Sequence, residues 1–146
     1  MRFLRELDKE QDSQRALVLI TNGLLELLAE TLVKNKCKNS NAILGDNRSY
    51  GYSTKLLLLN EIGIVSDSIY KTLKGFNRIR NKAAHEPFFE VTSGDLEALR
   101  SDLNTVLNND MKSSADLYHC CTTLFGILWN SHLDIFKPVF APSLEA

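Results

Sequence analysis

Apolar residues recur three or four positions apart along most of this 146-residue chain. Between residues 14 and 35 they include Leu17, Ile20, Leu24 and Leu28, and this spacing places them on one face of an α-helix. Glycine and proline, which punctuate the short strands and tight turns of β-sheet proteins, number only 7 and 3. The sequence therefore predicts an all-α fold in which the helices form an antiparallel bundle.

Helix start and stop signals divide this pattern into about six helices. Ser13 and Ser66 stand where N-cap residues are expected, and Gly63 stands where a helix would end in a left-handed residue. Pro138 is expected to end the last helix, which gives a single helical domain over 1–137 and a C-terminal tail over 138–146. The expected helices cover about 2–10, 14–35, 54–62, 67–85, 94–108 and 115–136.

A long polar loop is expected between the first long helix and the short helix that follows it. Residues 35–51 of this loop are rich in asparagine and carry glycine at two positions. Tyr50 and Tyr52 lie beside Arg48 and Lys55, a composition that could stack on nucleic-acid bases. Long loops are often functional, but such a composition is more often only solvated, so both interpretations stay open.

The composition does not favour a secreted, a membrane or a metal-binding protein. The first ten residues lack the apolar stretch of a secretory signal, and the longest apolar runs are too short to span a membrane. A cytoplasmic protein without a membrane partner is therefore expected. Cys37, Cys120 and Cys121 are odd in number, which suits free thiols in a reducing compartment. Neither a metal nor a cofactor is expected, because no ligand cluster and no glycine-rich phosphate loop is present.

The charge is divided unevenly along the chain, although its formal net value is only −1. Residues 68–85 contain five basic side chains and no acidic one, whereas residues 86–116 contain seven acidic and two basic ones. The commoner interpretation is a solvated helix that forms ion pairs with the acidic segment. The alternative is a small basic binding surface, which a near-neutral total does not exclude. The basic side chains of this helix are Lys71, Lys74, Arg78, Arg80 and Lys82.

The end of the basic helix carries the one motif with a chemical mechanism, the stretch Arg80-Asn81-Lys82-Ala83-Ala84-His85. At about 100° per residue, Arg78, Asn81, Lys82 and His85 share one strip of the helix surface. Arg80 borders this strip on the far side of Asn81. The helix dipole favours a histidine cation in the last turn of a helix, and a histidine beside Arg and Asn is a chemically usable group near neutral pH. The strip is therefore the predicted site.

The same stretch resembles the R-x4-6-H motif of the HEPN superfamily, including the polar residue that follows the arginine. More narrowly, the chain resembles the mannitol operon repressor family within that superfamily. The likeness covers roughly residues 13–100. One departure from the family pattern is the small Ala83-Ala84 step before the histidine, and the last helix matches less clearly. It is carried by Arg15-Ala16-Leu17-Val18-Leu19-Ile20, Leu24-Leu25-Glu26-Leu27-Leu28, Gly51-Tyr52-Ser53-Thr54-Lys55, Leu59-x-x-x-Gly63-Ile64-Val65 and Ile79 to His85.

The resemblance implies a HEPN-like helical bundle that forms a homodimer, with Arg80, Asn81 and His85 near a cleft between the two copies. Many members of the superfamily are metal-independent endoribonucleases. The mannitol operon repressor family is instead described as transcriptional regulators that lack a recognisable DNA-binding motif. The likeness also makes Glu26 a candidate to orient Arg80 or Asn81.

Three interpretations of the site stay open. The preferred one is a regulator that acts through a basic cleft, with RNA or a regulatory protein as its partner; sequence-specific DNA binding is not favoured, because no helix-turn-helix is recognisable. The second is a ribonuclease in which Arg80 or Arg78 holds phosphate and the two His85 of a dimer act as acid and base. The third is structural, with Arg80 paired to Glu26 or Glu86. The further residues expected to bind nucleic acid or a partner are Arg78, Lys82 and Lys74.

Overall fold

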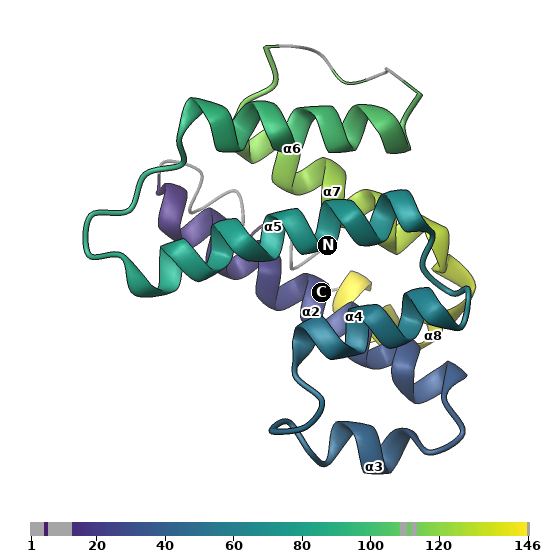
Figure 1. Cartoon of the computed structure of the whole chain (residues 1–146). Coiled ribbons are helices and arrows are strands. Elements are labelled where there is room, and N and C mark those ends of the chain that lie inside the picture. The colour runs from purple at the N-terminus through teal and green to yellow at the C-terminus, as the bar shows by residue number, and fades with distance from the viewer. Residues whose placement is uncertain (1–4, 6–12, 109–110, 112–113, 146) are drawn as a thin grey trace.

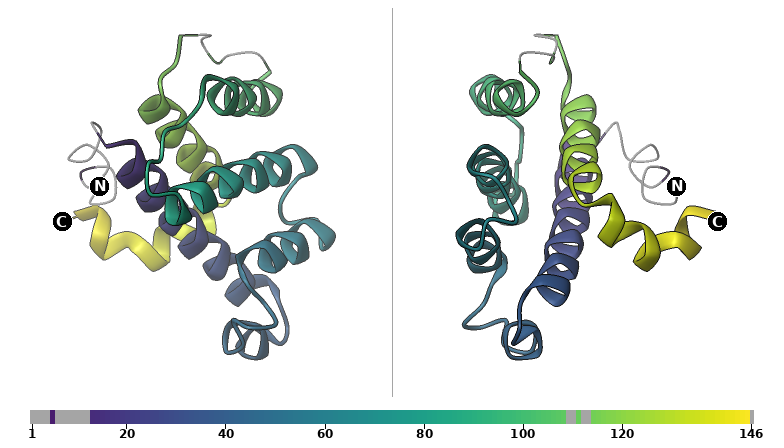
Figure 2. Two further views of the ribbon diagram at one scale, coloured as in Figure 1. Left: turned by 60° about the vertical axis from the view of Figure 1, so that its left-hand side comes forward. Right: turned by 90° about the vertical axis from the view of Figure 1, so that its right-hand side faces the viewer.

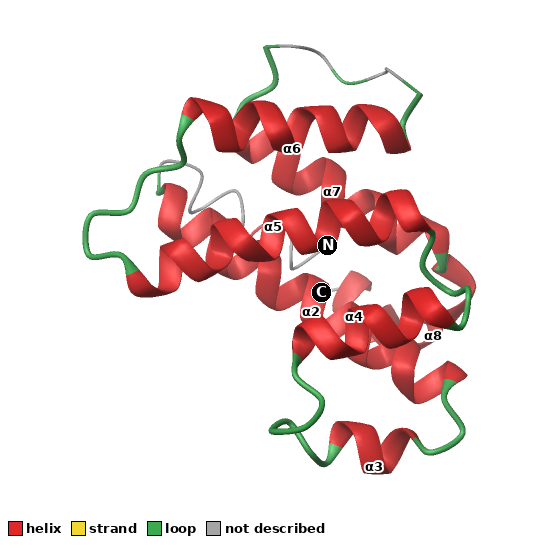
Figure 3. Ribbon diagram, in the orientation of Figure 1, coloured by secondary structure: helices red, strands yellow, loops and turns green. Residues whose placement is uncertain are grey.

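The computed structural model describes Arg5, residues 13–108, Met111 and residues 114–145. These residues form seven helices and no strand (Figure 1, Figure 3), so the predicted all-α bundle is confirmed. The expected helix over 2–10 lies outside the described residues, Arg5 apart. The helices are α2 (Gln14–Lys36), α3 (Ser40–Leu44), α4 (Tyr52–Glu61), α5 (Asp67–His85), α6 (Ser93–Val106), α7 (Leu117–Ser131) and α8 (Leu133–Glu145).

Helix α2 is the central element of the bundle and contacts α3, α4, α5, α7 and α8. In Figure 2, α4, α5 and α6 form one layer, α2 and α7 form a second, and α8 lies on the far side of that second layer. Helix α5 contacts α2, α4 and α6. The basic helix of the sequence therefore has two different flanks, one toward α4 and one toward α6.

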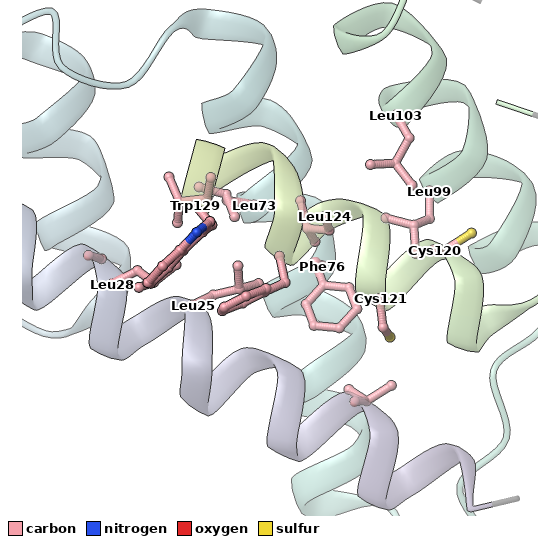
Figure 4. Close-up of a cluster of buried hydrophobic side chains, with 14 of the residues drawn as sticks. Leu25, Leu28, Leu73, Phe76, Leu99, Leu103, Cys120, Cys121, Leu124 and Trp129 are labelled. Carbon is pink, nitrogen blue, oxygen red and sulfur yellow. The ribbon is translucent and has the colours of Figure 1, made fainter. Parts of the chain in front are cut away.

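The core is almost wholly apolar; it lies between these two layers and continues between the second layer and α8. Trp129 of α7 stacks on Phe136 of α8, with ring centroids 5.5 Å apart. Each fully buried side chain of this size contributes about 1.5–3 kcal/mol relative to exposure to water. Figure 4 shows side chains of α2, α5, α6 and α7 that meet in the core, among them Leu25, Leu28, Leu73, Phe76, Leu99, Leu103, Leu124 and Trp129.

Local sequence signals account for where the two longest helices begin. Ser13 Oγ accepts a hydrogen bond from the Ala16 amide at 3.2 Å, and Ser66 Oγ accepts one from the Ile69 amide at 3.4 Å. Each hydroxyl satisfies a donor that the first turn of a helix leaves free. Gly63 has a φ of +78° in the turn before α5, a conformation that side chains disfavour. The predicted bounds of α2 and α5 are confirmed within one residue.

The expectation of an unbroken polar loop over 35–51 is wrong, because the five-residue helix α3 interrupts it. Helix α3 has no fully buried residue, but Ile43 and Leu44 are half-buried and pack against the core. After the helix ends, the Asp46 carboxylate accepts a hydrogen bond from the Ser49 amide at 3.0 Å. A helix of only five residues is too short for hydrophobic periodicity to reveal it.

The last predicted helix is in fact two helices that meet at His132. The His132 Nε2 atom lies 3.0 Å from the Ile64 carbonyl oxygen, which holds the turn against the α4–α5 connection. Helix α8 then runs through Pro138 to Glu145, so the expected end at this proline is wrong and the expected boundary at 137 falls inside a helix. Packing of Phe136 against Trp129 favours this continuation. Proline removes one backbone hydrogen bond from the helix, and because Pro138 is exposed, water can bond to the carbonyl group that is left free.

Helix α2 is long and apolar enough to cross a membrane, judged by length and composition alone. The expectation that the chain has no such segment is therefore wrong. Half of the most apolar window of α2 is buried inside the bundle. A helix that is apolar on most sides is expected at the centre of a bundle, where neighbouring helices cover it.

Candidate functional site

A polar pocket lies where α2, α4 and α5 meet, and we call it the Arg80 pocket. Its volume is about 340 Å³. Apart from Gly51, every residue that lines it carries a polar group on its side chain, which sets it apart from the apolar core beside it. The lining residues are Asn22, Glu26, Gly51, Tyr52, Ser53, Asn77, Arg80 and Asn81.

Helix α2 contributes to this pocket through polar residues four positions apart on an otherwise apolar helix. Asn22 and Glu26 line the pocket, and Glu30 continues the same row one turn further along. Asn22 is only 2% exposed. Polar residues repeated at one-turn spacing inside a buried helix are a signal that sequence reasoning could have used, but only Glu26 was singled out.

The Arg80 guanidinium forms no ion pair with any carboxylate of the described residues. Its Nη1 donates one hydrogen bond, 3.2 Å long, to the Asn81 side-chain oxygen. Glu26 shares the pocket with Arg80, but the ion pair considered for these two residues is not formed. The pocket thus combines a cation and an anion that do not neutralise each other by direct contact.

Two buried polar atoms of this pocket lack a hydrogen-bond partner among the described residues, Asn22 Oδ1 and Tyr52 Oη. Burial raises the pKa of the Tyr52 phenol well above its usual value, and the Glu26 carboxylate raises it further. The phenol is therefore neutral at physiological pH and can donate a hydrogen bond. Leaving such a group without a partner costs about 1–3 kcal/mol, so a ligand that supplies the partner gains that energy.

His85 does not line the Arg80 pocket. It is the last residue of α5 and is exposed. It lies five positions after Arg80, so the two side chains leave the helix about 140° apart. The backbone that follows His85 is held by Arg15 of α2, whose Nη2 donates to the carbonyl oxygens of Glu86 at 2.7 Å and Pro87 at 3.0 Å. Within one copy of the protein, Arg80 and His85 at the two ends of the predicted motif therefore lie apart.

Arg78 and Lys82 lie on the other flank of α5 and line a groove against α6, which we call the Arg78 groove. Lys82 Nζ lies 3.3 Å from Asp95 Oδ1, and Lys71 Nζ lies 3.6 Å from Asp102 Oδ1. These contacts confirm that the basic helix forms ion pairs with the acidic segment. They also divide the predicted strip, since Asn81 belongs to the Arg80 pocket and Lys82 to the groove.

Lys74 lies in neither the Arg80 pocket nor the Arg78 groove. Its Nζ atom lies 5.9 Å from the centre of the Tyr70 ring, one turn earlier on α5. Such a cation–π contact at an exposed site is worth about 0.5–1 kcal/mol. The structure thus gives this predicted binding residue a local partner on its own helix.

Lys55, which the sequence placed in the short helix after the polar loop, is among the largest fully buried side chains of the described residues. It lies in α4, and its Nζ is 3.2 Å from Glu30 Oε1 and 3.1 Å from Asn47 Oδ1. This contact ties the segment before α4 to α2. Since Gly51 and Tyr52 follow that segment and line the Arg80 pocket, Lys55 supports one wall of the pocket.

The three cysteines are free, as predicted. Burial raises the pKa of Cys120 to about 11 and that of Cys121 to about 12, so both thiols are protonated at neutral pH. Thiols in this state are poor nucleophiles and poor metal ligands. Among the described residues, no group of three or more histidine, cysteine, aspartate or glutamate side chains is placed to hold a metal ion.

Comparison with protein families, with curated proteins and with solved structures finds no match for this chain. The resemblance to the mannitol operon repressor family therefore stays a prediction.

Proposed function

We propose that this chain is a regulatory protein, similar to the mannitol operon repressor family, whose Arg80 pocket binds a small polar ligand that carries one anionic group. One observation carries the proposal: Asn22 and Tyr52, whose buried Oδ1 and Oη atoms lack partners among the described residues, line a pocket together with an arginine that no carboxylate of the described residues pairs with. A ligand with hydroxyl groups and an anion would satisfy all three groups.

The chemistry of the lining decides the kind of ligand. Arg80 donates to an anionic oxygen, preferably through two parallel hydrogen bonds. The Glu26 carboxylate and Asn22 Oδ1 accept hydrogen bonds from hydroxyl groups, and Tyr52 Oη can donate or accept. A pocket of about 340 Å³ is at the small end of ligand sites, so the ligand is small. A sugar phosphate has this combination of hydroxyl groups and anionic oxygens.

Ribose 5-phosphate is a suitable probe, with ribose and inorganic phosphate as its two halves. By isothermal titration calorimetry we expect the whole probe to bind more tightly than either half. Arg80→Gln should weaken binding at least about tenfold, since a charge-assisted hydrogen bond is worth about 1.5–3 kcal/mol. Arg48→Gln is the matched control, because Arg48 is exposed and lies outside the pocket. Equal binding by wild type and Arg80→Gln would exclude this pocket as the site.

A ribonuclease is the second candidate, and the position of His85 gives it a specific form. RNA cleavage through the 2′-hydroxyl needs a base, an acid and a cation near the phosphate. In one copy His85 is exposed at the end of α5, away from the Arg80 pocket, so a second copy would have to supply the missing group. The enzyme therefore requires the homodimer, which is itself a proposal.

An RNA-cleavage assay in EDTA separates the two candidates. The regulator predicts no cleavage above background by wild type, whereas the ribonuclease predicts cleavage that His85→Ala abolishes. Analytical ultracentrifugation of the same samples tests the dimer. Cleavage that survives in His85→Ala would indicate a contaminating nuclease, and a monomer without activity would leave ligand binding as the function of the Arg80 pocket.

A further inference from the structure

The Arg78 groove between α5 and α6 differs from the Arg80 pocket in the chemistry of its lining. Its volume is about 480 Å³, and α5 and α6 lie side by side along it (Figure 1). Ile79 and Leu99 line it with apolar surface and are themselves 5% and 3% exposed. The Arg80 pocket has no such apolar lining, so the two sites suit different ligands.

Ion pairs close the two ends of this groove. Lys82 reaches Asp95 at one end and Lys71 reaches Asp102 at the other. The aspartates are the more buried partners, because their side chains are 20% and 18% exposed while those of Lys82 and Lys71 are 45% and 76% exposed. Gly75 makes room for this arrangement, since a Cβ atom at this position would lie 3.3 Å from Asp102 Oδ2.

Arg78 lies between the two ion pairs along α5. Its guanidinium forms no hydrogen bond and no ion pair with the described residues, and it is exposed. Opposite it, α6 presents the small residues Ala98 and Ser101, which leave the middle of the groove open. The open part of the groove therefore offers one free guanidinium, one hydroxyl and an apolar floor.

We propose that the Arg78 groove binds a small amphipathic carboxylate, with its carboxylate group on Arg78 and its apolar body over Ile79 and Leu99. Arginine binds a carboxylate through two parallel hydrogen bonds, and the Ser101 hydroxyl supplies a further donor. The volume of the groove lies within the range of sites that bind small organic molecules.

The charges of the groove favour a ligand with a single negative charge. Lys71, Arg78 and Lys82 face Asp95 and Asp102, which leaves one net positive charge. A monoanion neutralises this charge without disturbing the ion pairs at the ends. A dianion such as a phosphate monoester would bring excess negative charge close to both aspartates.

The test uses 3-phenylpropionate as the probe, with acetate and 3-phenyl-1-propanol as its charged and apolar halves. Binding is followed through the amide NMR signals of the folded protein. We expect the probe to shift the signals of Ile79, Leu99 and Ser101, and to bind at least about tenfold more tightly than either half. Arg78→Gln should abolish this gain, and Ala98→Leu should weaken binding by filling the groove. Arg48→Gln, outside the groove, should bind as wild type does.

Each other outcome overturns the proposal. Equal affinity for 3-phenylpropionate and 3-phenyl-1-propanol would show that the groove is an apolar surface that does not recognise the carboxylate. Equal affinity for acetate and the probe would show that the apolar floor contributes nothing. No shift at these residues at millimolar probe, or unchanged binding by Arg78→Gln, would exclude the site. The proposal is independent of the Arg80 pocket, because Arg80→Gln leaves every group of the groove in place.

Discussion

Helix α5 separates two polar regions that satisfy their charges in different ways. On its α4 side, the Lys55 side chain is 1% exposed and depends on Glu30 and Asn47, and Tyr52 Oη has no partner among the described residues. On its α6 side, the lysines remain in water and reach across to the aspartates. The first region is desolvated and the second is solvated, although both contain ordinary charged residues in the sequence.

This difference predicts where a single substitution changes the stability of the protein most. Burial removes water as an alternative partner, so each polar group on the α4 side depends on its particular neighbour. On the α6 side water replaces a lost partner, and a surface ion pair is worth about 0–1 kcal/mol. We therefore expect stability to be concentrated on the α4 side, while the α6 side can exchange partners at little cost.

The largest effect is expected for Lys55→Ala. The substitution removes a fully buried side chain and leaves Glu30 and Asn47 without their partner. Breaking a buried ion pair costs about 3–5 kcal/mol, and we expect about 3 kcal/mol because the Glu30 side chain is 39% exposed and can regain water. Urea denaturation followed by circular dichroism measures the loss in the free energy of unfolding.

Lys55→Met is the matched control for packing. Methionine fills a similar volume without the charge, so we expect a smaller loss of about 1 kcal/mol. A loss below about 0.5 kcal/mol in Lys55→Ala would contradict the comparison, because the α4 side would then behave like a solvated surface.

Tyr52→Phe is expected to leave stability unchanged or to raise it by up to about 1 kcal/mol at pH 7. The hydroxyl that it removes is buried without a partner among the described residues, so no hydrogen bond is lost. The same substitution should weaken ligand binding in the Arg80 pocket. A gain in stability with a loss of binding would mark Tyr52 as a residue kept for function.

The pKa of Tyr52 adds an alkaline test of the same residue. Its pKa is raised in the folded protein, so the folded state keeps a proton that the unfolded state loses near pH 10. The free energy of unfolding therefore falls as the pH rises above about 10, and this component should be absent in Tyr52→Phe. Tyr50→Phe is the control for the loss of a phenol. Parallel pH profiles for wild type and Tyr52→Phe would show that the phenol ionises without unfolding.

Much of the fold could be predicted because its signals are local. Cap residues such as Ser13 and Ser66, and the turn at Gly63, act within a few residues of themselves. The break at His132 and the continuation through Pro138 depend on contacts with Ile64 and with the aromatic core, which are distant in the sequence. Periodicity along one segment contains no information about such contacts.

The candidate site shows the same limit. The motif residues Arg80 and His85 were found from the sequence, but a helical wheel alone placed Arg78, Asn81, Lys82 and His85 on one strip. The wheel could not show that α4 and α6 cover the two flanks of α5 and assign Asn81 and Lys82 to different sites. Asn22 was not a candidate from the sequence, and Tyr52 was a candidate only for base stacking; both were assigned to the Arg80 pocket only once the structure showed their unpartnered atoms.

Gly75→Ala tests how easily the α6 side adjusts. Alanine is favoured over glycine inside a helix by about 0.5–1 kcal/mol, but its Cβ atom would lie 3.3 Å from Asp102 Oδ2. Because that oxygen is the end of a side chain whose ion pair is with an exposed lysine, we expect it to move and the protein to gain about 0.5 kcal/mol. A destabilised variant, measured by urea denaturation, would show that the groove is as rigid as the Lys55 region.

The smallest effects are expected for Lys71→Ala and Lys82→Ala, each below about 0.5 kcal/mol in the free energy of unfolding. Both lysines are well exposed, so water replaces the aspartate as their partner, and added salt should reduce even this small difference. Binding of 3-phenylpropionate in the Arg78 groove should weaken slightly in both variants, because the net charge of the groove falls to zero while Arg78 remains. A loss near that of Lys55→Ala would contradict the comparison, since it would mean that the two flanks of α5 depend equally on their ion pairs.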